Sequence, residues 1–369
     1  MILLAVRNLT SERTRFAFSA AGIGFAVFLI TVLLGLYQGW NQKVGGFVED
    51  VHADAWVARQ GTTDFINAAS ILPGSLGQQL QARPDVAAVH PLIVRPMSLR
   101  HDGDKVETHL IGYDVSSGIG GPLRITKGKG NPSGNEIVID EVLSRVSGVG
   151  IGDELTSGGT SLKVIGLSGG GNFAFTQASF ISIETAGALL GMGDLVTFWL
   201  VEVKDRAALP ELQSGVSGSV PGVTVFTSKE FASATRHRIL DNVIPIIGMI
   251  VGLAFIVGIA ITSLTIYTAT VERTREYGVM KAIGFNNRDL YRLVVIQSLI
   301  TGLLGFVFGA ALTLLISQFI DRLVAQFIVF VRPQDILFVL LATVVMAAGA
   351  SIVPARRVGS VDPAVAFKG

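Results

Sequence analysis

Four long stretches without a charged residue constrain this chain more than any other feature. Each holds about 20 residues or more, and most of those residues are apolar. A helix needs about 20 such residues to cross the hydrocarbon core of a bilayer, and lipid offers no partner to an unpaired peptide group. The sequence therefore predicts four membrane-spanning helices, at residues 16–42, 242–271, 293–320 and 336–355.

The composition agrees with a membrane protein and excludes several other classes. Only 15% of the residues are charged and the mean hydropathy is +0.56, whereas an ordinary soluble domain carries about 25% charged residues. The net charge of +1 gives no overall field that would attract nucleic acid, so we expect no nucleic-acid partner. The chain has no cysteine, which excludes a disulfide scaffold and a thiol nucleophile.

The short flanks of the spans predict the topology. Lys and Arg gather in residues 1–15, 272–292 and 356–369, whereas residues 321–335 carry two arginines balanced by two aspartates. Basic flanks mark the cytoplasmic side of a membrane helix. We therefore expect a multi-pass protein of the bacterial inner membrane with both termini in the cytoplasm. The long segment 43–241 then lies outside the membrane.

The first span has one alternative interpretation, a cleaved signal peptide. It is longer than the usual apolar core of a signal peptide, and its outer end lacks an Ala-x-Ala-like site. Tyr37 and Trp40 at that end suit an interfacial aromatic anchor, so an uncleaved helix is favoured. The preceding residues 1–15 predict a short amphipathic helix on the inner leaflet.

The segment 43–241 has the texture of a folded α+β domain. Residues 136–140 and 161–165 alternate as strands do, and the glycines of 148–153 indicate a turn. A helix-like run that leads through a proline into a strand occurs twice, at 76–86 and again at 209–223. This repeat predicts two halves, with the strand-rich middle at about 105–185 inserted between them.

Few residues in the chain suggest catalysis, a cofactor or a metal. No Gly-x-x-x-x-Gly-Lys-Ser/Thr motif occurs, and Gly166–Asn172 lacks the helix start that a phosphate loop needs. His101 and His109 would meet only across a hairpin, and a structural role is favoured over metal binding. The spans carry no acid or base, which argues against an ion-coupled carrier or an intramembrane protease. The chain is therefore not expected to be an enzyme.

The distinctive segment lies between the second and third predicted spans. Glu272 and Glu276 are four residues apart, as are Arg273 and Tyr277, so the second helix is expected to continue as a charged stalk. Gly278 would allow a sharp turn. Pro245 would either kink the second span or mark its start.

A short amphipathic element follows that turn. Val279, Met280 and Ile283 would form an apolar face beside Lys281, and Gly284 would end the element as a helix cap. Such a face suits docking into a groove on a partner. The alternative is a solvated connector, which would not need exposed Met280 and Ile283.

This run resembles the signature of the FtsX-like ABC transporter permeases, the superfamily of the macrolide exporter MacB and the lipoprotein-release permeases. The tail at 354–367 and the strand–helix–turn stretch at 135–155 are similar to the same family, as is the order of one span, a large outside domain and three spans. In length, the chain is most similar to the permeases of the DevC/HrtB branch. The residues that carry the resemblance are Glu272, Arg273, Glu276, Tyr277, Gly278, Met280, Lys281, Ala282, Ile283 and Gly284.

The resemblance implies a homodimer, or a heterodimer with a close paralogue, bound to two separate ATPase subunits that hold ATP and Mg²⁺. In the family the segment between the second and third spans couples to the ATPase, and motion of the second helix expels substrate outside the membrane. A periplasmic membrane-fusion protein is a further partner in parts of the family. The Gly305-x-x-x-Gly309 motif of the third span would pack helices within one subunit.

The outer halves of the first two spans are the predicted substrate groove. Their apolar and aromatic side chains would suit a lipid or another amphipathic molecule, although the same residues would equally suit lipid-facing or packed positions. A regulatory membrane protein that acts on a partner outside the cell is the alternative function; a peptide sensor or a membrane-embedded enzyme fits less well. The groove residues are Leu33, Leu36, Tyr37, Trp40, Ile244 and Ile247.

Overall fold

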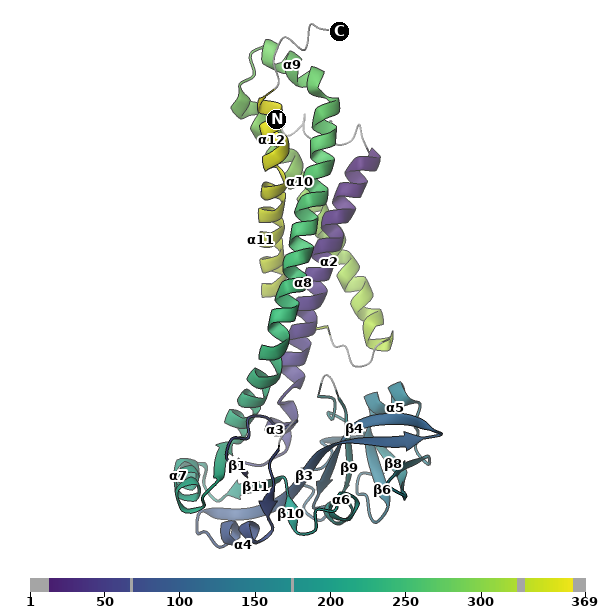
Figure 1. Ribbon diagram of the computed structural model, residues 1–369, viewed down its shortest axis with the longest axis vertical. Coiled ribbons are helices and arrows are strands. Elements are labelled where there is room, and N and C mark those ends of the chain that lie inside the picture. The colour runs from purple at the N-terminus through teal and green to yellow at the C-terminus, as the bar shows by residue number, and fades with distance from the viewer. Residues whose placement is uncertain (1–12, 67–68, 174–175, 324–328, 361–369) are drawn as a thin grey trace. The chain divides into compact units, whose positions relative to one another are not determined.

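The computed structural model describes residues 13–66, 69–173, 176–323 and 329–360 (Figure 1). The amphipathic segment predicted at 1–15 and the tail from 361 onward thus lie almost wholly outside the described residues. The chain divides into two compact units. The first, here called the bundle, comprises Met1–Gln38, Ile244–Arg322 and Val329–Gly369, and the second, the inserted domain, comprises Gly39–Val243 with Leu323–Ile328.

Within the described residues, four helical segments are long and apolar enough to cross a membrane, as the sequence predicts. Helix α8 is the longest of them, with 45 residues. The shorter helix α12 follows α11 directly after Ser351, and α9 lies between α8 and α10. The bounds are α2 Arg13–Lys43, α8 Ser228–Glu272, α9 Thr274–Ala282, α10 Asn287–Leu323, α11 Pro333–Ala350 and α12 Ile352–Gly359.

The start of α8 excludes one of the two predicted roles of Pro245. The helix begins at Ser228 and not near residue 242, and Pro245 lies inside it, so the view that Pro245 marks the helix start is wrong. Thr227 and Glu230 form a capping box: the Thr227 amide donates to the Glu230 carboxylate at 2.9 Å, and the Glu230 amide donates to the Thr227 hydroxyl at 3.2 Å. In the last predicted span, 336–355, the helix is interrupted at Ser351, between α11 and α12.

Glycines bring α2 and α10 together inside the bundle. A Cβ added to Gly305 would lie 2.7 Å from Ile23, and one added to Gly309 would overlap the carbonyl oxygen of Gly24. The predicted small-residue motif of the third span therefore packs helices within one chain. Around this contact an apolar core joins α2, α8 and α11 through Val27, Ala254 and Met346.

The inserted domain is built on a ten-stranded sheet in the order β12-β1-β11-β3-β4-β9-β6-β8-β5, with β7 paired to β3 and β8. The strands predicted at 136–140 and 161–165 are present within β6 and β8. The bounds are β1 Ala55–Arg59, β3 Val86–His101, β4 Asp104–Tyr113, β5 Arg124–Gly128, β6 Glu136–Asp140, β7 Glu154–Ser157, β8 Thr160–Gly169, β9 Ala178–Ser182, β11 Phe198–Val203 and β12 Val223–Thr227, and β2 Leu72–Pro73 pairs with β10 Leu195–Val196.

Short helices pack on the sheet. The two predicted helix-then-strand units are confirmed, since α4 leads into β3 and α7 leads into β12. Both helices contribute to one apolar core through Leu76, Leu80, Leu212 and Val216. The bounds are α3 Gly46–Asp50, α4 Ser75–Gln81, α5 Glu141–Ser147, α6 Ile183–Leu189, η1 Arg206–Ala208 and α7 Leu209–Ser219.

The first turns of α8 are anchored within the inserted domain. Phe231 lies in an aromatic cluster with Trp56 and Phe198, with ring centroids 5.4 and 5.5 Å away. Arg236 pairs with the Glu49 carboxylate at 2.8 Å and donates to the Val44 carbonyl at 3.0 Å. The start of α8 is therefore held by charge pairing as well as by apolar packing.

Within the described residues, the glycine-rich stretch and the two histidines that were considered for phosphate or metal binding make structural contacts. The Gly171 amide in the glycine-rich stretch donates to the Asp140 carboxylate at 3.0 Å. His109 is buried against the Thr176 hydroxyl and the Ile66 carbonyl, whereas His101 stands opposite Asp104 at the end of the β3–β4 hairpin. The two histidines are several register positions apart, and the described residues contain no group of three potential metal ligands.

Candidate functional site

Helix α9 contains most of the predicted coupling residues, and its start at Thr274 lies four residues before the predicted turn at Gly278. Helix α8 ends at Glu272, and Arg273, with φ −95° and ψ 18°, redirects the chain into α9. Gly278, at which the turn was predicted, lies buried within α9. The stalk and the docking element are therefore separated at Arg273.

The end of α9 forms the predicted glycine cap. Gly284 has φ +108°, a left-handed conformation that a side chain would disfavour. Its amide donates to the Lys281 carbonyl at 3.0 Å, and the Phe285 amide donates to the Met280 carbonyl at 3.0 Å. This pair of bonds is the Schellman arrangement, which closes the helix and turns the chain toward α10.

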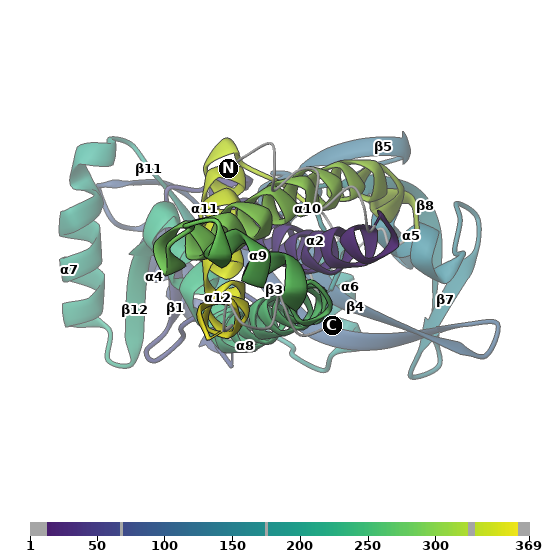
Figure 2. The ribbon, with the colours of Figure 1, turned by 90° about the horizontal axis from the view of Figure 1, so that it is seen from above.

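Tyr277 fixes the orientation of α9 in the bundle. Its side chain is only 2% exposed, and it lies in an apolar core with Ile266 of α8, Leu290 of α10 and Val358 of α12. Burial raises the pKa of the Tyr277 hydroxyl. Helices α9 and α12 thus meet at the same end of the bundle (Figure 2).

The apolar face that α9 exposes differs in one residue from the predicted one. Ile283 is 73% exposed and Val279 is 43% exposed, as docking requires. Met280, in contrast, is half-buried and packs against the core around Tyr277. The exposed pair is therefore Val279 and Ile283, one helical turn apart, with the small Ala282 beside them.

Charged groups surround this face. The Arg273 guanidinium lies 3.7 Å from the Glu276 carboxylate, three residues along the chain. The Lys281 ammonium donates to the Gly359 carbonyl of α12 at 2.8 Å. Glu272 and Glu276 are exposed. Lys281 thus contacts α12, which the sequence did not indicate.

The predicted groove residues fall into two groups. Leu33, Leu36, Tyr37 and Ile247 are half-buried in the bundle, and Ile244 is exposed. Trp40 is 7% exposed and belongs to the inserted domain, so its indole does not face an open groove. The predicted substrate groove would form only between two copies of the chain, and it remains a prediction.

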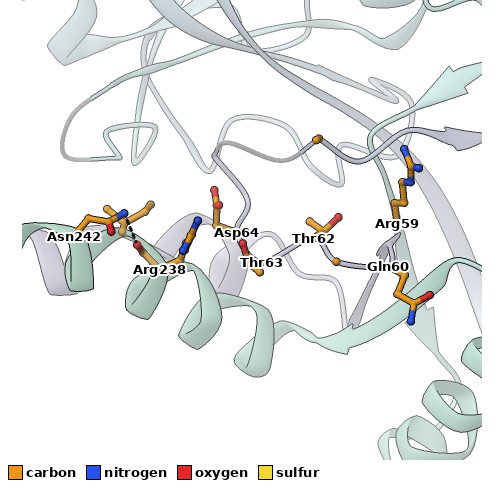
Figure 3. Close-up of a pocket in the computed structure, with 10 residues that line it drawn as sticks. Arg59, Gln60, Thr62, Thr63, Asp64, Arg238 and Asn242 are labelled. Atoms are coloured by element: carbon orange, nitrogen blue, oxygen red, sulfur yellow. Dashed lines mark hydrogen bonds between the residues drawn. The ribbon is translucent and has the colours of Figure 1, made fainter.

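A pocket of about 650 Å³ in the inserted domain was not found from the sequence (Figure 3). Arg59 at the end of β1, the loop through Thr62 and Thr63, and Arg238 and Asn242 of α8 line it. The sequence marks only one part of its lining, through the basic run Arg236-His237-Arg238, which three residues separate from the second apolar stretch.

Two family models cover most of this chain. The model for the FtsX-like permease C-terminal region matches residues 248–363, and the model for the MacB-like periplasmic core domain matches residues 16–218. The chain belongs to the FtsX-like ABC transporter permeases. It is a multi-pass membrane protein of permease type, with the MacB-like domain between its first and second spans.

Two relatives and one solved structure give the extent of the similarity. An uncharacterised ABC transporter permease of Mycobacterium tuberculosis is 25% identical over 373 residues, which cover 100% of both chains. The macrolide export ATP-binding/permease protein MacB of Hahella chejuensis is 21% identical over 96% of this chain and 58% of its own length. The periplasmic region of MacB from Actinobacillus actinomycetemcomitans is 13% identical, with a TM-score of 0.37, and the match covers 48% of this chain and 90% of that one.

The family assignment carries two consequences. Permease subunits of this family are not enzymes themselves, and they work with an ATPase in the assembled transporter. The narrower placement in the DevC/HrtB branch stays a prediction.

Proposed function

We propose that this chain is the permease subunit of an ABC exporter and that a separate ATPase subunit drives it through α9. The observation that carries the proposal is the two-sided character of α9. Tyr277 locks one side into a core shared with α8, α10 and α12, while Val279 and Ile283 stand exposed on the other. A helix built this way has an apolar surface to bury against a partner and a rigid attachment that passes force on.

Helix α8 is the proposed lever. It is continuous over 45 residues, which corresponds to a length of about 68 Å at 1.5 Å per residue. Its last turns contact Tyr277 through Ile266, and its first turns are anchored by Phe231 and Arg236 in the inserted domain. Displacement of α9 would therefore reach the inserted domain along one uninterrupted helix, and substrate would be extruded mechanically rather than passed through a channel.

The assembly that we propose contains two ATPase subunits, which bind ATP and Mg²⁺, and a second permease copy. In the single chain α8 exposes a row of large apolar side chains, among them Met249, Leu253 and Ile256. Gly248 and Gly252 in the same stretch have open space beside them, so a second helix can approach closely. An apolar groove between two such copies would suit an amphipathic or lipid-like substrate.

We further propose the inner membrane as the location, with both termini and α9 in the cytoplasm and the inserted domain outside. The support is the distribution of Lys and Arg in the flanks of the spans. A membrane-fusion protein as an additional partner rests on the family resemblance alone.

The test replaces the exposed pair of α9. In the double variant Val279→Asp/Ile283→Asp, burial worth about 1.5–3 kcal/mol per side chain is lost and two charges enter the contact. Co-purification with the ATPase should drop to background. Addition of this variant should then no longer change the rate of ATP hydrolysis by the ATPase. The unchanged core around Tyr277 should keep the variant folded.

The matched control is Val146→Asp/Ile151→Asp, which makes the same chemical change at two exposed apolar residues of the inserted domain. It should retain the ATPase. If the α9 variant also retains the ATPase and still supports substrate-dependent turnover, α9 is not the coupling element.

A further inference from the structure

An open apolar groove of about 400 Å³ runs along α8 within the bundle. Its lining on α8 recurs every three or four residues from Ile256 to Tyr267, so it forms one face of the helix. Val353 of α12 closes the opposite side. The lining is wholly apolar before Ser263, and its two hydroxyl groups belong to Ser263 and Tyr267. The groove therefore becomes more polar toward the end of α8.

Helix α12 continues α11 along one side of α8 (Figures 1 and 2). A Cβ added to Gly349 of α11 would lie 3.6 Å from the Ile259 side chain, and Val358 of α12 shares an apolar core with Ile266. Both pairs advance in the same direction along the chain, so α8 and α12 run parallel. Val353 lies between these two contacts and therefore faces the stretch of α8 between Ile259 and Ile266.

Two arginines stand one helical turn beyond Val353. Arg356 and Arg357 follow it by three and four residues, a spacing that places side chains on the same side of a helix. Both are exposed, and within the described residues neither guanidinium group makes an ion pair or a hydrogen bond. Pro354 and Val358 are buried on the other side of α12. One end of the apolar groove is therefore flanked by two positive charges.

The groove has about the length of one leaflet. From Ile256 to Tyr267 the helix rises about 16–17 Å, and the hydrocarbon core of a bilayer is about 30 Å thick. The charge-free run of α8 ends at Val271, four residues after Tyr267, so the Tyr267 end belongs to the membrane interface, where tyrosine is favoured. The apolar part of the groove thus faces acyl chains, and the arginines face the headgroups.

We propose that this groove binds an anionic phospholipid, with an acyl chain along α8 and the phosphate at Arg356 and Arg357. Guanidinium donors match phosphate oxygens, and basic residues beside a membrane helix attract anionic lipids. The leaflet is the one at the α12 end, which is the inner leaflet in the proposed topology. The site is separate from the predicted substrate groove, which uses the outer halves of the first two spans, and it does not depend on coupling by α9.

A second copy of the chain is the competing occupant, because Ile256 also belongs to the row that we propose as the contact between copies. That row includes Gly248 and Gly252, whereas the groove lining has no glycine that would admit a helix closely. Two copies with the same orientation in the membrane would also bring their Arg356 and Arg357 side chains to one level, where like charges repel. The charge at the end of the groove therefore favours a phosphate over a second helix.

The test is native mass spectrometry of the full chain in a non-ionic detergent, without an ATPase. The mass gives both the number of copies and the number of bound lipids. The probes are phosphatidylglycerol and phosphatidylcholine with the same acyl chains. One test variant, Arg356→Gln/Arg357→Gln, removes the two cations, and the other, Ala260→Phe, fills the apolar part of the groove from an exposed position.

Each test variant has a matched control on α10, outside the groove. Arg288→Gln/Arg292→Gln removes two exposed cations from the first turns of α10, and Ala311→Phe enlarges an exposed alanine of the same helix. Circular dichroism checks that all four variants are folded.

We expect the wild type to bind phosphatidylglycerol more tightly than phosphatidylcholine. Loss of the two arginines should weaken phosphatidylglycerol binding by about ten-fold, and phosphatidylcholine binding by less, because choline offsets the charge of the phosphate. Ala260→Phe should weaken binding of both lipids, since both place an acyl chain in the groove. The controls should change either affinity by less than about two-fold.

Three results would overturn the proposal. Equal weakening by Arg288→Gln/Arg292→Gln would mean that general positive charge, and not this site, attracts the lipid. Unchanged phosphatidylglycerol binding in either test variant would place the lipid elsewhere. Conversion of a dimer to a monomer by Ala260→Phe, with lipid binding retained, would mean that a second copy covers the groove. Because the ATPase is absent from this assay, none of these results bears on coupling by α9, and failure of the α9 variant leaves this site untouched.

Discussion

The Lys281 ammonium donates a hydrogen bond of 2.8 Å to the carbonyl oxygen of Gly359, 78 residues further along the chain. Gly359 is the last residue of α12, where the helix presents carbonyl groups without an intrahelical partner. A lysine is favoured at such an end by hydrogen bonding and by the helix dipole. A Cβ on Gly359 would overlap the Tyr291 hydroxyl, so this end of α12 is closely held from a second side. Helix α9 is therefore attached to α12 as well as to α8.

This attachment predicts a separable effect of Lys281. In Lys281→Met the bond to Gly359 is lost while Val279 and Ile283 stay exposed, so we expect the ATPase still to bind. A charged hydrogen bond of this kind is worth about 1.5–3 kcal/mol, so α12 should loosen and substrate-stimulated ATP hydrolysis should fall. The measurement compares co-purification with stimulated hydrolysis in the same preparation.

Arg288→Met serves as the control, because Arg288 is an exposed cation on the nearby first turn of α10. It should change neither quantity. An unchanged stimulation in Lys281→Met would show that the α9–α12 bond takes no part in coupling.

The contact between α2 and α10 predicts the cost of a single methyl group. Gly309→Ala places a Cβ against the carbonyl oxygen of Gly24 and against Val27, both of which are fixed by helix packing. Overpacking of this kind typically costs about 1–3 kcal/mol. We expect a lower thermal unfolding midpoint for the full chain in detergent.

Gly218→Ala in α7 is the matched substitution, since no atom lies within 4 Å of the added methyl and the position lies outside the proposed contact between permease copies. Alanine is the better helix former by about 1 kcal/mol, so this variant should be as stable as the wild type or more so. Equal destabilisation by both variants would contradict the packing described for Gly309.

The sequence predicts only those features whose physical cause lies within a short segment, and α9 is an example. Gly284 could be identified as a cap because a left-handed residue is needed there. The exposed face was harder to predict. Met280 lies three residues after Tyr277 and shares the buried side of the helix, whereas Ile283 lies four residues after Val279 and shares its exposed side. The buried partners of Tyr277 come from α10 and α12, so its burial could not be read from the segment alone.

The start of α8 shows the same point for the fold. Residues 228–241 contain five charged residues, so a search for long uncharged apolar stretches does not include them in the second helix. The Thr227-x-x-Glu230 capping box was a readable signal of the true helix start. The pocket at Arg59 and Arg238 could not be predicted in the same way, because it depends on how β1 and α8 meet across 179 positions of the sequence.

The proposed topology predicts which positions react with a reagent that cannot cross the membrane. The chain has no cysteine, so single cysteines can be introduced without a background signal. In intact cells Lys105→Cys in the inserted domain should be labelled, and Asn287→Cys at the start of α10 should be labelled only after the cells are opened. Both residues are exposed, so protection would report the membrane and not burial. The reverse pattern would invert the topology and place α9 beyond the reach of a cytoplasmic ATPase.

Asp140 predicts a dependence of stability on pH that runs against the usual trend. It is the N-cap of α5, its side chain is 1% exposed, and burial raises its pKa to about 6 despite hydrogen bonds from the Val142 and Gly171 amides. Because the folded-state pKa lies above the ordinary value of 3.8, the folded chain takes up a proton more readily than the unfolded one. This group therefore stabilises the fold as the pH falls from about 6 toward 4.

The shift corresponds to about 3 kcal/mol across that range at 1.36 kcal/mol per pH unit. Asp85, Asp114, Glu136 and Glu230 have lowered pKa values and act in the opposite direction, mainly below their ordinary range near pH 4. The measurement is therefore a difference: unfolding midpoints of the wild type and of Asp140→Asn are compared at steps between pH 4 and 7. The wild type should gain stability relative to Asp140→Asn as the pH falls, since the amide cannot take up the proton. Parallel curves would show that the Asp140 carboxylate titrates normally in the folded chain.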